Sequence, residues 1–217
     1  MESLQEIKWP NEGNMKKENK TIFYSERKDG PHKNGVGFIV SDDTLPQLKE
    51  FKAVNDRLCY IRIAGRIFDI IIINAYAPTE EKVENLKSDF YDDLDNILDT
   101  TTNSCIKILI GGFNAKIGKE DMYIPTIGPN SLHDVSNDNG TRLINLCLAK
   151  GIIRKDIHKQ TWIAPNGITK NQFIHGQNCS SNEANNVALT TDIWRLMNTD
   201  SFITLTAHFF DKIPRDI

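Results

Sequence analysis

One apolar strand that ends in two glycines constrains the fold of this chain more than any other segment. Residues 106 to 110 form a largely apolar run that predicts a buried strand, and Gly111 and Gly112 break the run. Asn114 follows at the carboxyl end of that strand, where open α/β sheets place the side chains that handle ligands. The segment therefore predicts a buried strand whose end carries a candidate functional group.

Other segments predict further strands in the same fold. Leu58 to Ile63 and Phe68 to Tyr76 flank Ala64-Gly65-Arg66, a pattern typical of a hairpin with glycine in its turn. Ile70 to Ile73 are all apolar, so we expect both faces of this strand to be covered. Four shorter runs are also rich in strand formers: Thr21–Tyr24, Val36–Val40, Thr161–Ala164 and Thr169–Phe173.

Two segments have the spacing of amphipathic helices. Apolar residues recur at helical spacing from residue 86 to residue 98, with Asp and Glu on the opposite face, which predicts a helix lying on a sheet. A second helix is expected to begin at Asp138 or Asn139, both good N-caps, and to end at Gly151. The predicted fold class is α/β (α+β), a two-sheet β-sandwich with outer helices. The apolar positions of the first helix are Leu86, Phe90, Leu94, Ile97 and Leu98.

Composition excludes several classes of protein. The 217 residues suit one domain, or one domain with a fragment, and 39% hydrophobic and 25% charged residues are ordinary for a soluble protein. No run approaches the roughly 18 apolar residues of a membrane helix. Glu2 and Glu6 make the N-terminus unlike a secretory signal, so we expect an intracellular protein, nuclear or cytoplasmic, with no membrane and no small-molecule cofactor. The cysteines lack a CxxC pair and are expected to be reduced core thiols: Cys59, Cys105, Cys147 and Cys179.

The net charge of −3 gives no overall field that attracts nucleic acid, but basic residues cluster locally. Such clusters either contact phosphates or lie on solvated loops, and the sequence alone leaves both interpretations open. The clusters are Lys16, Lys17 and Lys20; Arg27, Lys28 and Lys33; and Arg154, Lys155, His158 and Lys159.

Motifs along residues 1 to about 175 occur in an order that resembles one protein family. The strand segment GGFN at 111–114 resembles the GDFN strand of the endonuclease/exonuclease/phosphatase superfamily. The whole series resembles the LINE-type and craniofacial development protein 2-like group of that superfamily. The other motifs are a QE strand at 4–9, NAYAPT at 74–79, DNG with Arg142-Leu143 at 138–143, HKQTW at 158–162, and Asn166-Gly167 followed by Asn171-Gln172.

The resemblance implies cleavage of DNA phosphodiester bonds with Mg²⁺, or with Mn²⁺ in its place. It assigns Glu6 as a metal ligand, Tyr76 as a contact of the scissile phosphate, and Asn114 as a donor to a phosphate oxygen. Each assignment has a structural alternative. Glu6 could be a surface residue near the terminus, Tyr76 a core aromatic on a buried strand, and Asn114 the residue that caps the turn after a strand. Further candidates for substrate contact are Lys116, His158 and Thr161.

The chain departs from the family pattern at positions that carry the chemistry. Gly112 stands where the family has the Asp that orients the attacking water, and Ile174 stands where it has another Asp. The strand with the first Asn of the family and the closing Ser-Asp-His strand do not occur, so the fold is expected to be incomplete at both ends. Because groups in one catalytic constellation are strongly non-additive, we expect weak metal binding and impaired cleavage.

The sequence after Phe173 changes character and predicts a division of the chain. We expect an endonuclease/exonuclease/phosphatase-like domain over 1–175, a polar linker over 176–186, and a separate piece over 187–217. The last piece resembles a fragment of a hAT-type transposase or zinc-finger BED protein, with Asp192 at the position of that family's first catalytic carboxylate. Asp192 also suits an N-cap or a surface position.

The sequence thus predicts a degenerate relative of a retrotransposon-type DNA endonuclease. The alternative prediction is a non-catalytic remnant of a mobile element that binds nucleic acid or protein.

Overall fold

The structure is a computed structural model. It describes residues 1–102, 104–124, 126–127, 131 and 133–152 with their side chains, and the backbone alone of 153–154, 162–163, 170–171, 176–178 and 203–206. The predicted positions His158, Thr161 and Ile174 lie outside the described residues, as do Cys179 and Asp192.

Two β-sheets and two longer helices make up the described part of the chain. The strands and helices, in order, are β1 (Glu2–Ile7), β2 (Glu12–Lys17), β3 (Lys20–Ser25), β4 (Gly35–Ser41), η1 (Leu45–Gln47), β5 (Leu48–Ala53), β6 (Leu58–Ile63), β7 (Ile70–Tyr76), α1 (Glu84–Thr100), β8 (Ile106–Gly112), η2 (Asp121–Tyr123), α2 (Asp138–Lys150), β9 (Ile152–Arg154), β10 (Trp162–Ile163), β11 (Lys170–Asn171), β12 (Gly176–Asn178) and β13 (Ile203–Thr206).

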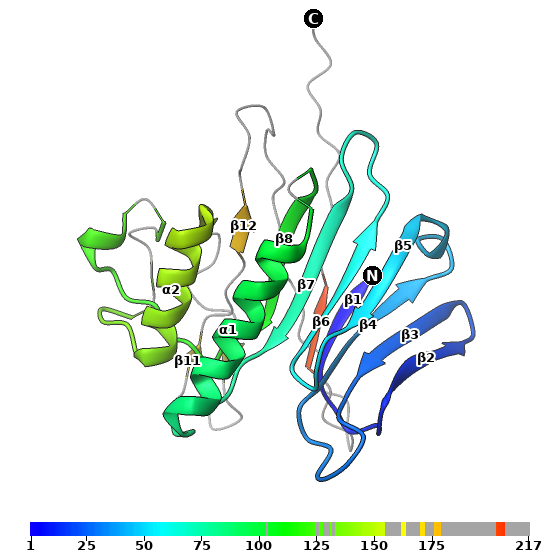
Figure 1. Cartoon of the computed structure of the whole chain (residues 1–217), viewed down its shortest axis with the longest axis horizontal. Coiled ribbons are helices and arrows are strands. Elements are labelled where there is room, and N and C mark those ends of the chain that lie inside the picture. Colours follow the sequence, from blue (N-terminus) through cyan, green and yellow to red (C-terminus); the bar gives the residue numbers. More distant parts are fainter. Residues whose placement is uncertain are drawn as a thin grey trace, which may run out of the picture.

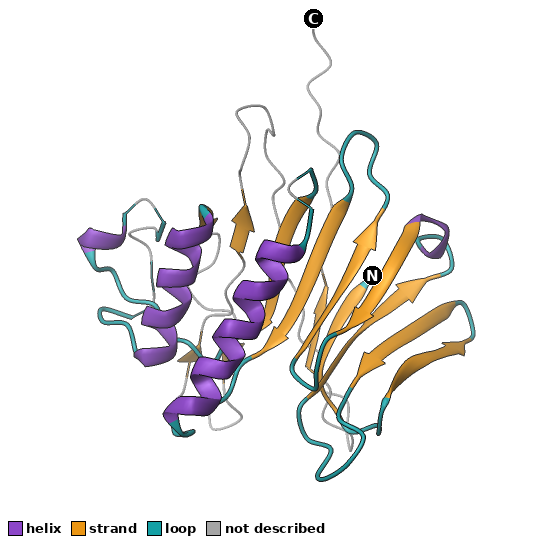
Figure 2. Ribbon diagram, in the orientation of Figure 1, coloured by secondary structure: helices purple, strands orange, loops and turns teal. Residues whose placement is uncertain are grey.

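The strands form a five-stranded sheet in the order β13-β1-β4-β3-β2 and a six-stranded sheet in the order β5-β6-β7-β8-β12-β9. β7 and β8 pair in parallel, joined by α1, whereas β6 pairs with β7 as an antiparallel hairpin. Figure 1 shows α1 and α2 beside β8 on one side of the molecule, with β4, β3 and β2 on the other. The helices and strands are also distinguished by colour in Figure 2. The predicted two-sheet sandwich with outer helices is confirmed.

Alternate side chains of β7 serve two different cores, because successive side chains of a strand point to opposite faces. Ile72 packs with Phe38 and Ile110 between the two sheets. Ile71 and Ile73 pack instead against the helices, in a core that includes Leu94 and Leu143. Both faces of β7 are therefore covered, as its apolar sequence predicts.

The helices agree with their predicted positions except at their ends. Leu86 was expected on the buried face of α1 but is 37% exposed, because it lies in the first turn and faces a surface cavity rather than the sheet. The N-cap of α2 is Asn137, not Asp138 or Asn139, and its Oδ1 accepts a hydrogen bond from the backbone N–H of Gly140 at 2.8 Å. Gly151 ends α2 in the left-handed conformation, as predicted.

Four described strands were not predicted from the sequence: β2, β5, β9 and β12. β2 is mostly exposed and polar, and β5 mixes exposed charged residues with the half-buried Leu48 and Phe51, so neither has an apolar run. Each lies at one edge of its sheet, where its lysines discourage further pairing. β12 falls at the start of the predicted linker and pairs with both β8 and β9. In the tail, β13 pairs with β1, from Glu2 opposite Thr206 to Gln5 opposite Ile203. The short hairpin of β10 and β11 was expected.

The described cysteines Cys59, Cys105 and Cys147 are buried and form no disulfide within the described residues, in agreement with the predicted reduced core thiols. Neither described helix is long and apolar enough to cross a membrane.

Candidate functional site

A bulge in β1 directs the Glu6 side chain. The register of β1 against β4 shifts between Leu4 and Ile7, and Glu6 has φ of 59°. A residue with a side chain rarely adopts this left-handed conformation, and bulges commonly re-aim side chains next to functional sites. The backbone at Glu6 is therefore held in an uncommon conformation, and its carboxylate reaches across to the end of β7.

Glu6 and Tyr76 are in direct contact although 70 residues separate them. The Tyr76 hydroxyl donates a hydrogen bond to Oε1 of Glu6 at 2.5 Å. Burial raises the pKa of the Tyr76 phenol, and the hydrogen bond to Glu6 and its charge raise the pKa further. The structure thus brings these two site candidates together. The Tyr76 hydroxyl and one carboxylate oxygen of Glu6 are already bonded to each other.

Arg57 supports Tyr76 from the other side. One terminal N–H of its guanidinium donates to the Tyr76 carbonyl at 3.0 Å, and the guanidinium lies 5.6 Å from the centre of the Tyr76 ring. This distance is in the range of a cation–π interaction. No sequence pattern singled out Arg57, which is an ordinary charged residue before an apolar strand.

Gly112 lies opposite Tyr76 in the parallel pair of β7 and β8. A Cβ atom at Gly112 would lie 3.3 Å from Cδ2 of the Tyr76 ring, so a side chain at this position would face the Glu6–Tyr76 pair. Gly111 has a different role, because its φ is 134° and a Cβ there would lie only 1.9 Å from the Ala75 carbonyl oxygen. Close backbone packing therefore requires glycine at position 111. At position 112 a side chain would need only a small shift of the Tyr76 ring.

Asn114 lies in the loop after β8 and bonds to the loop after β7. Its Nδ2 donates to the carbonyl of Ala77 at 2.7 Å, and its backbone has φ of 48°. The side chain therefore connects the exits of the two parallel strands at Ala77, the residue after Tyr76. Within the described residues it forms no hydrogen bond with Tyr76 or Glu6. This is the turn role that the sequence left open, with one N–H of the side-chain amide already bonded to protein.

Lys116 is held through its backbone. Its N–H donates to Oδ1 of Asn137 at 2.8 Å, and its side chain is exposed. Gly140 must be glycine here, since a Cβ would lie 1.9 Å from the Lys116 carbonyl oxygen. The DNG motif therefore serves the close approach of α2 to the loop after β8.

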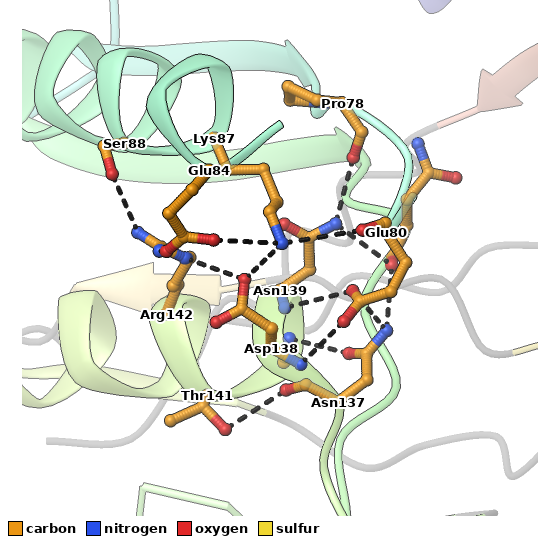
Figure 3. A network of polar contacts seen from close by, with 12 residues as sticks. Pro78, Glu80, Glu84, Lys87, Ser88, Asn137, Asp138, Asn139, Thr141 and Arg142 are labelled. Atoms are coloured by element: carbon orange, nitrogen blue, oxygen red, sulfur yellow. Dashed lines mark hydrogen bonds and ion pairs between the residues drawn. The ribbon is translucent and has the colours of Figure 1, made fainter. Parts of the chain in front are cut away.

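Glu80 caps α2 from outside the helix, a contact that the sequence analysis missed. Figure 3 shows its carboxylate directed at the first residues of α2. It accepts from the backbone N–H of Asp138 at 3.0 Å, from that of Asn139 at 3.3 Å, and from Nδ2 of Asn137 at 2.8 Å. A carboxylate suits this place because the N-terminus of a helix carries unpaired N–H groups and partial positive charge.

The same network reaches α1 and the loop after β7 (Figure 3). Lys87 of α1 donates to Asp138 at 2.6 Å, and Arg142 pairs with both Asp138 and Glu84. Asn139 is fully buried, and its Nδ2 donates to the carbonyl of Pro78 at 2.9 Å. The network thus fixes the exits of β7 and β8 against both helices.

A second buried contact joins the two sheets beside Glu6. Nε2 of Gln5 donates to Oδ1 of Asn74 at 2.8 Å, and Nδ2 of Asn74 donates to the carbonyls of Leu4 and Gly37 at 2.8 and 2.9 Å. Gln5 is 2% and Asn74 0% exposed. These neighbours of Glu6 and Tyr76 in the motifs have a structural role.

The described residues do not fit the expected Mg²⁺ site. Mg²⁺ takes an octahedral shell of oxygens, usually with one or two carboxylates and several waters. No group of three or more His, Cys, Asp or Glu side chains that could hold a metal occurs within the described residues. Glu6 brings one carboxylate, which is bonded to a phenol, and Gly112 brings none.

Comparison with known proteins found one kind of curated relative and several similar folds. No protein-family model matches the chain. Craniofacial development protein 2 from Bos taurus is 29% identical over 177 residues, which cover 78% of this chain and 29% of that protein. The chain therefore spans less than a third of this curated relative.

Two solved structures resemble the fold. The endonuclease domain of TRAS1, a telomere-specific non-LTR retrotransposon, has a TM-score of 0.55 at 12% identity, covering 87% of this chain and 78% of that one. An endonuclease/exonuclease/phosphatase family protein from Leptotrichia buccalis C-1013-b has a TM-score of 0.50 at 14% identity, covering 87% and 70%. The chain shares its fold with these two structures. At these identities the likeness establishes the fold and leaves activity to the site itself.

Proposed function

We propose that this chain is a degenerate relative of a retrotransposon-type, Mg²⁺-dependent DNA endonuclease, with impaired cleavage. The fold, the order of the motifs, and the similarity to craniofacial development protein 2 and the TRAS1 endonuclease domain support the ancestry. The observation that carries the impairment is Gly112. It faces the Glu6–Tyr76 pair where the family motif has a carboxylate, and it offers only a hydrogen atom.

The remaining groups are engaged in bonds within the protein. In a related nuclease the metal would polarise the phosphate and supply a nucleophilic water. Here the Tyr76 hydroxyl is bonded to Glu6, and the Asn114 amide is bonded to Ala77. We therefore assign no catalytic step to these residues, and we expect at most weak binding of Mg²⁺ or Mn²⁺. Lys116, His158 and Thr161 stay as candidates for substrate contact.

The test is nicking of supercoiled plasmid DNA with Mg²⁺ or Mn²⁺, comparing the chain with its Glu6→Gln variant. We expect both to give only background nicking, equal within error and insensitive to EDTA. Metal-dependent nicking by the chain that Glu6→Gln abolishes would show an active nuclease and refute the proposal.

A second candidate is a non-catalytic remnant that binds nucleic acid or protein. The burial of Gln5 and Asn74 and their mutual hydrogen bond favour it, since these motif residues maintain the fold independently of any reaction. Gel-shift titration with DNA under non-cleaving conditions separates binding from cleavage. An intracellular location and a transposase-like origin of residues 187–217 belong to this proposal as well.

A further inference from the structure

A cavity of about 490 Å³ lies on the surface between the loop from β3 to β4, the turn before β6, and the first turns of α1. Lys33, Asn34, Arg57 and Lys82 line it, with Leu86 and Phe90 as its apolar wall. Arg57 also contacts the Tyr76 carbonyl and ring, so the cavity adjoins the Glu6–Tyr76 pair. The exposure of Leu86 on α1 is explained by its place in this wall.

Arg57 has donors to spare. Its guanidinium has five N–H groups. Within the described residues, only one of them donates a hydrogen bond, to the Tyr76 carbonyl, and the guanidinium forms no ion pair. The residue is partly buried, and burial lowers the pKa of its guanidinium although Asp56 raises it. A partly desolvated cation without a bound carboxylate favours an anionic ligand, since an unpaired charge away from water is unfavourable.

No acidic residue of the cavity forms an ion pair with Arg57 within the described residues. Asp56 is bonded to Arg27 and to Nδ2 of Asn34; burial raises the pKa of its carboxyl, but these hydrogen bonds and the charges of Arg27 and Arg57 bring the pKa below its usual value. Asp93 accepts from Nδ2 of Asn55 at 2.9 Å and, like Asp89, is exposed on α1. Lys33 and Lys82 are exposed and have no side-chain bond within the described residues. Arg57, Lys33 and Lys82 are thus the cations available to a ligand.

We propose that this cavity binds a phosphate group, with Arg57 on its inner side and Lys33 and Lys82 at its mouth. A planar guanidinium suits two oxygens of a phosphate, and ammonium groups add less directional contacts. Leu86 and Phe90 provide an apolar surface for the sugar or base that the phosphate carries. The phosphate belongs to a mononucleotide or to a nucleic-acid backbone, and the second case rests on the proposed nucleic-acid-binding function.

The test is an NMR titration of the full chain with inorganic phosphate, with a nucleoside monophosphate, and with a short DNA duplex. The probes are the Arg57 side-chain Nε–H and the Asn34 side-chain NH₂, which report from inside the cavity. The key variant is the double substitution Lys33→Glu with Lys82→Glu. Its matched control is Lys28→Glu with Lys52→Glu, which changes the net charge equally at exposed lysines outside the cavity lining.

We expect the signals of both probes to shift on titration. The cavity variant should weaken binding about tenfold. It should also reduce the slope of log affinity against log salt concentration for the duplex, in which each phosphate contact contributes about one. The control should change affinity less than about twofold after its general charge effect. Mononucleotide binding in the cavity without duplex binding would support the pocket and refute the nucleic-acid function. Duplex binding that both double variants weaken equally, or titrations that leave both probes unshifted, would refute the pocket.

Discussion

Two groups of residues at the ends of β1, β7 and β8 and the start of α2, most of them from the motifs, differ in the kind of contact they make. The polar frame, defined as Gln5, Asn74, Glu80 and Asn139, bonds across sheets and helices, and Gln5, Asn74 and Asn139 are buried. The rim, defined as Glu6, Tyr76 and Gly112, has one carboxylate, one phenol bonded to it, and a glycine. The frame is what the fold needs, and the rim is what a reaction would need. The two can be separated because they rely on different side chains.

The largest expected effect is in the frame, at Asn74. Asn74→Ala would leave the carbonyls of Leu4 and Gly37 and the amide of Gln5 without a partner in the core. Unpaired buried polar groups each cost about 1–3 kcal/mol, so we expect a loss of about 3 kcal/mol in the free energy of unfolding. Urea denaturation measures it. A loss below about 1 kcal/mol would show that Asn74 does not hold the sheets together.

The next effect is at Glu80. Glu80→Ala removes the carboxylate that caps α2, and helix capping is typically worth about 1 kcal/mol. Glu80→Gln should lose less, because its amide oxygen can still accept one bond. Glu81 is exposed and forms no side-chain bond within the described residues, so Glu81→Ala is the matched control and should stay within about 0.5 kcal/mol. Equal losses at both positions would contradict the proposed cap.

Tyr76→Phe tests the rim through pH. Burial raises the pKa of Tyr76, and also those of Tyr60 and Tyr91, above the ordinary value of about 10. A raised folded-state pKa contributes stability that is complete below the unfolded-state pKa and is lost as pH rises toward the folded-state pKa. Stability should therefore fall above pH of about 10, and less steeply in Tyr76→Phe. Parallel curves for the two proteins, followed by denaturation at each pH, would show that Tyr76 keeps an ordinary pKa.

The smallest effect on stability is predicted for the tail. If residues 1–175 fold independently, deletion of residues 184–217 should move the thermal midpoint by no more than about 2 °C. β13, however, pairs with β1 over four residues. A drop well beyond that limit would show that the tail closes the β1 edge of the sandwich and that the predicted division of the chain is wrong.

The apolar patterns were enough to predict the strands and helices that form the cores. β6, β7 and β8 carry local apolar runs, whereas β2 and β5 are edge strands without one. The bond between Gln5 and Asn74 spans 69 residues, so no local pattern could show it. Glu80 was missed for a similar reason, because the helix N-terminus it caps lies 58 residues away.

The candidate site was predicted through the family resemblance more than through physical pattern. Glu6, Tyr76 and Asn114 were expected to share one site; Glu6 and Tyr76 are in contact, whereas the Asn114 side chain bonds to Ala77. The bulge that joins them depends on a left-handed Glu6, which no side-chain preference signals. Arg57 and its cavity arise from three separate segments, and their meeting could be seen only in the fold.

The most direct test of a retained frame and a lost reaction is repair of the rim by Gly112→Asp. The new Cβ has room with a small shift of the Tyr76 ring, and its carboxylate would join Glu6 at the same site. The measurement is plasmid nicking with Mg²⁺ or Mn²⁺, comparing the chain with this variant. We expect slightly tighter metal binding in the variant and only background nicking from both, because repair of one of several losses recovers little. Strong metal-dependent nicking by Gly112→Asp would show that Gly112 is the single decisive lesion, and nicking by the unmodified chain would show that the reaction was never lost.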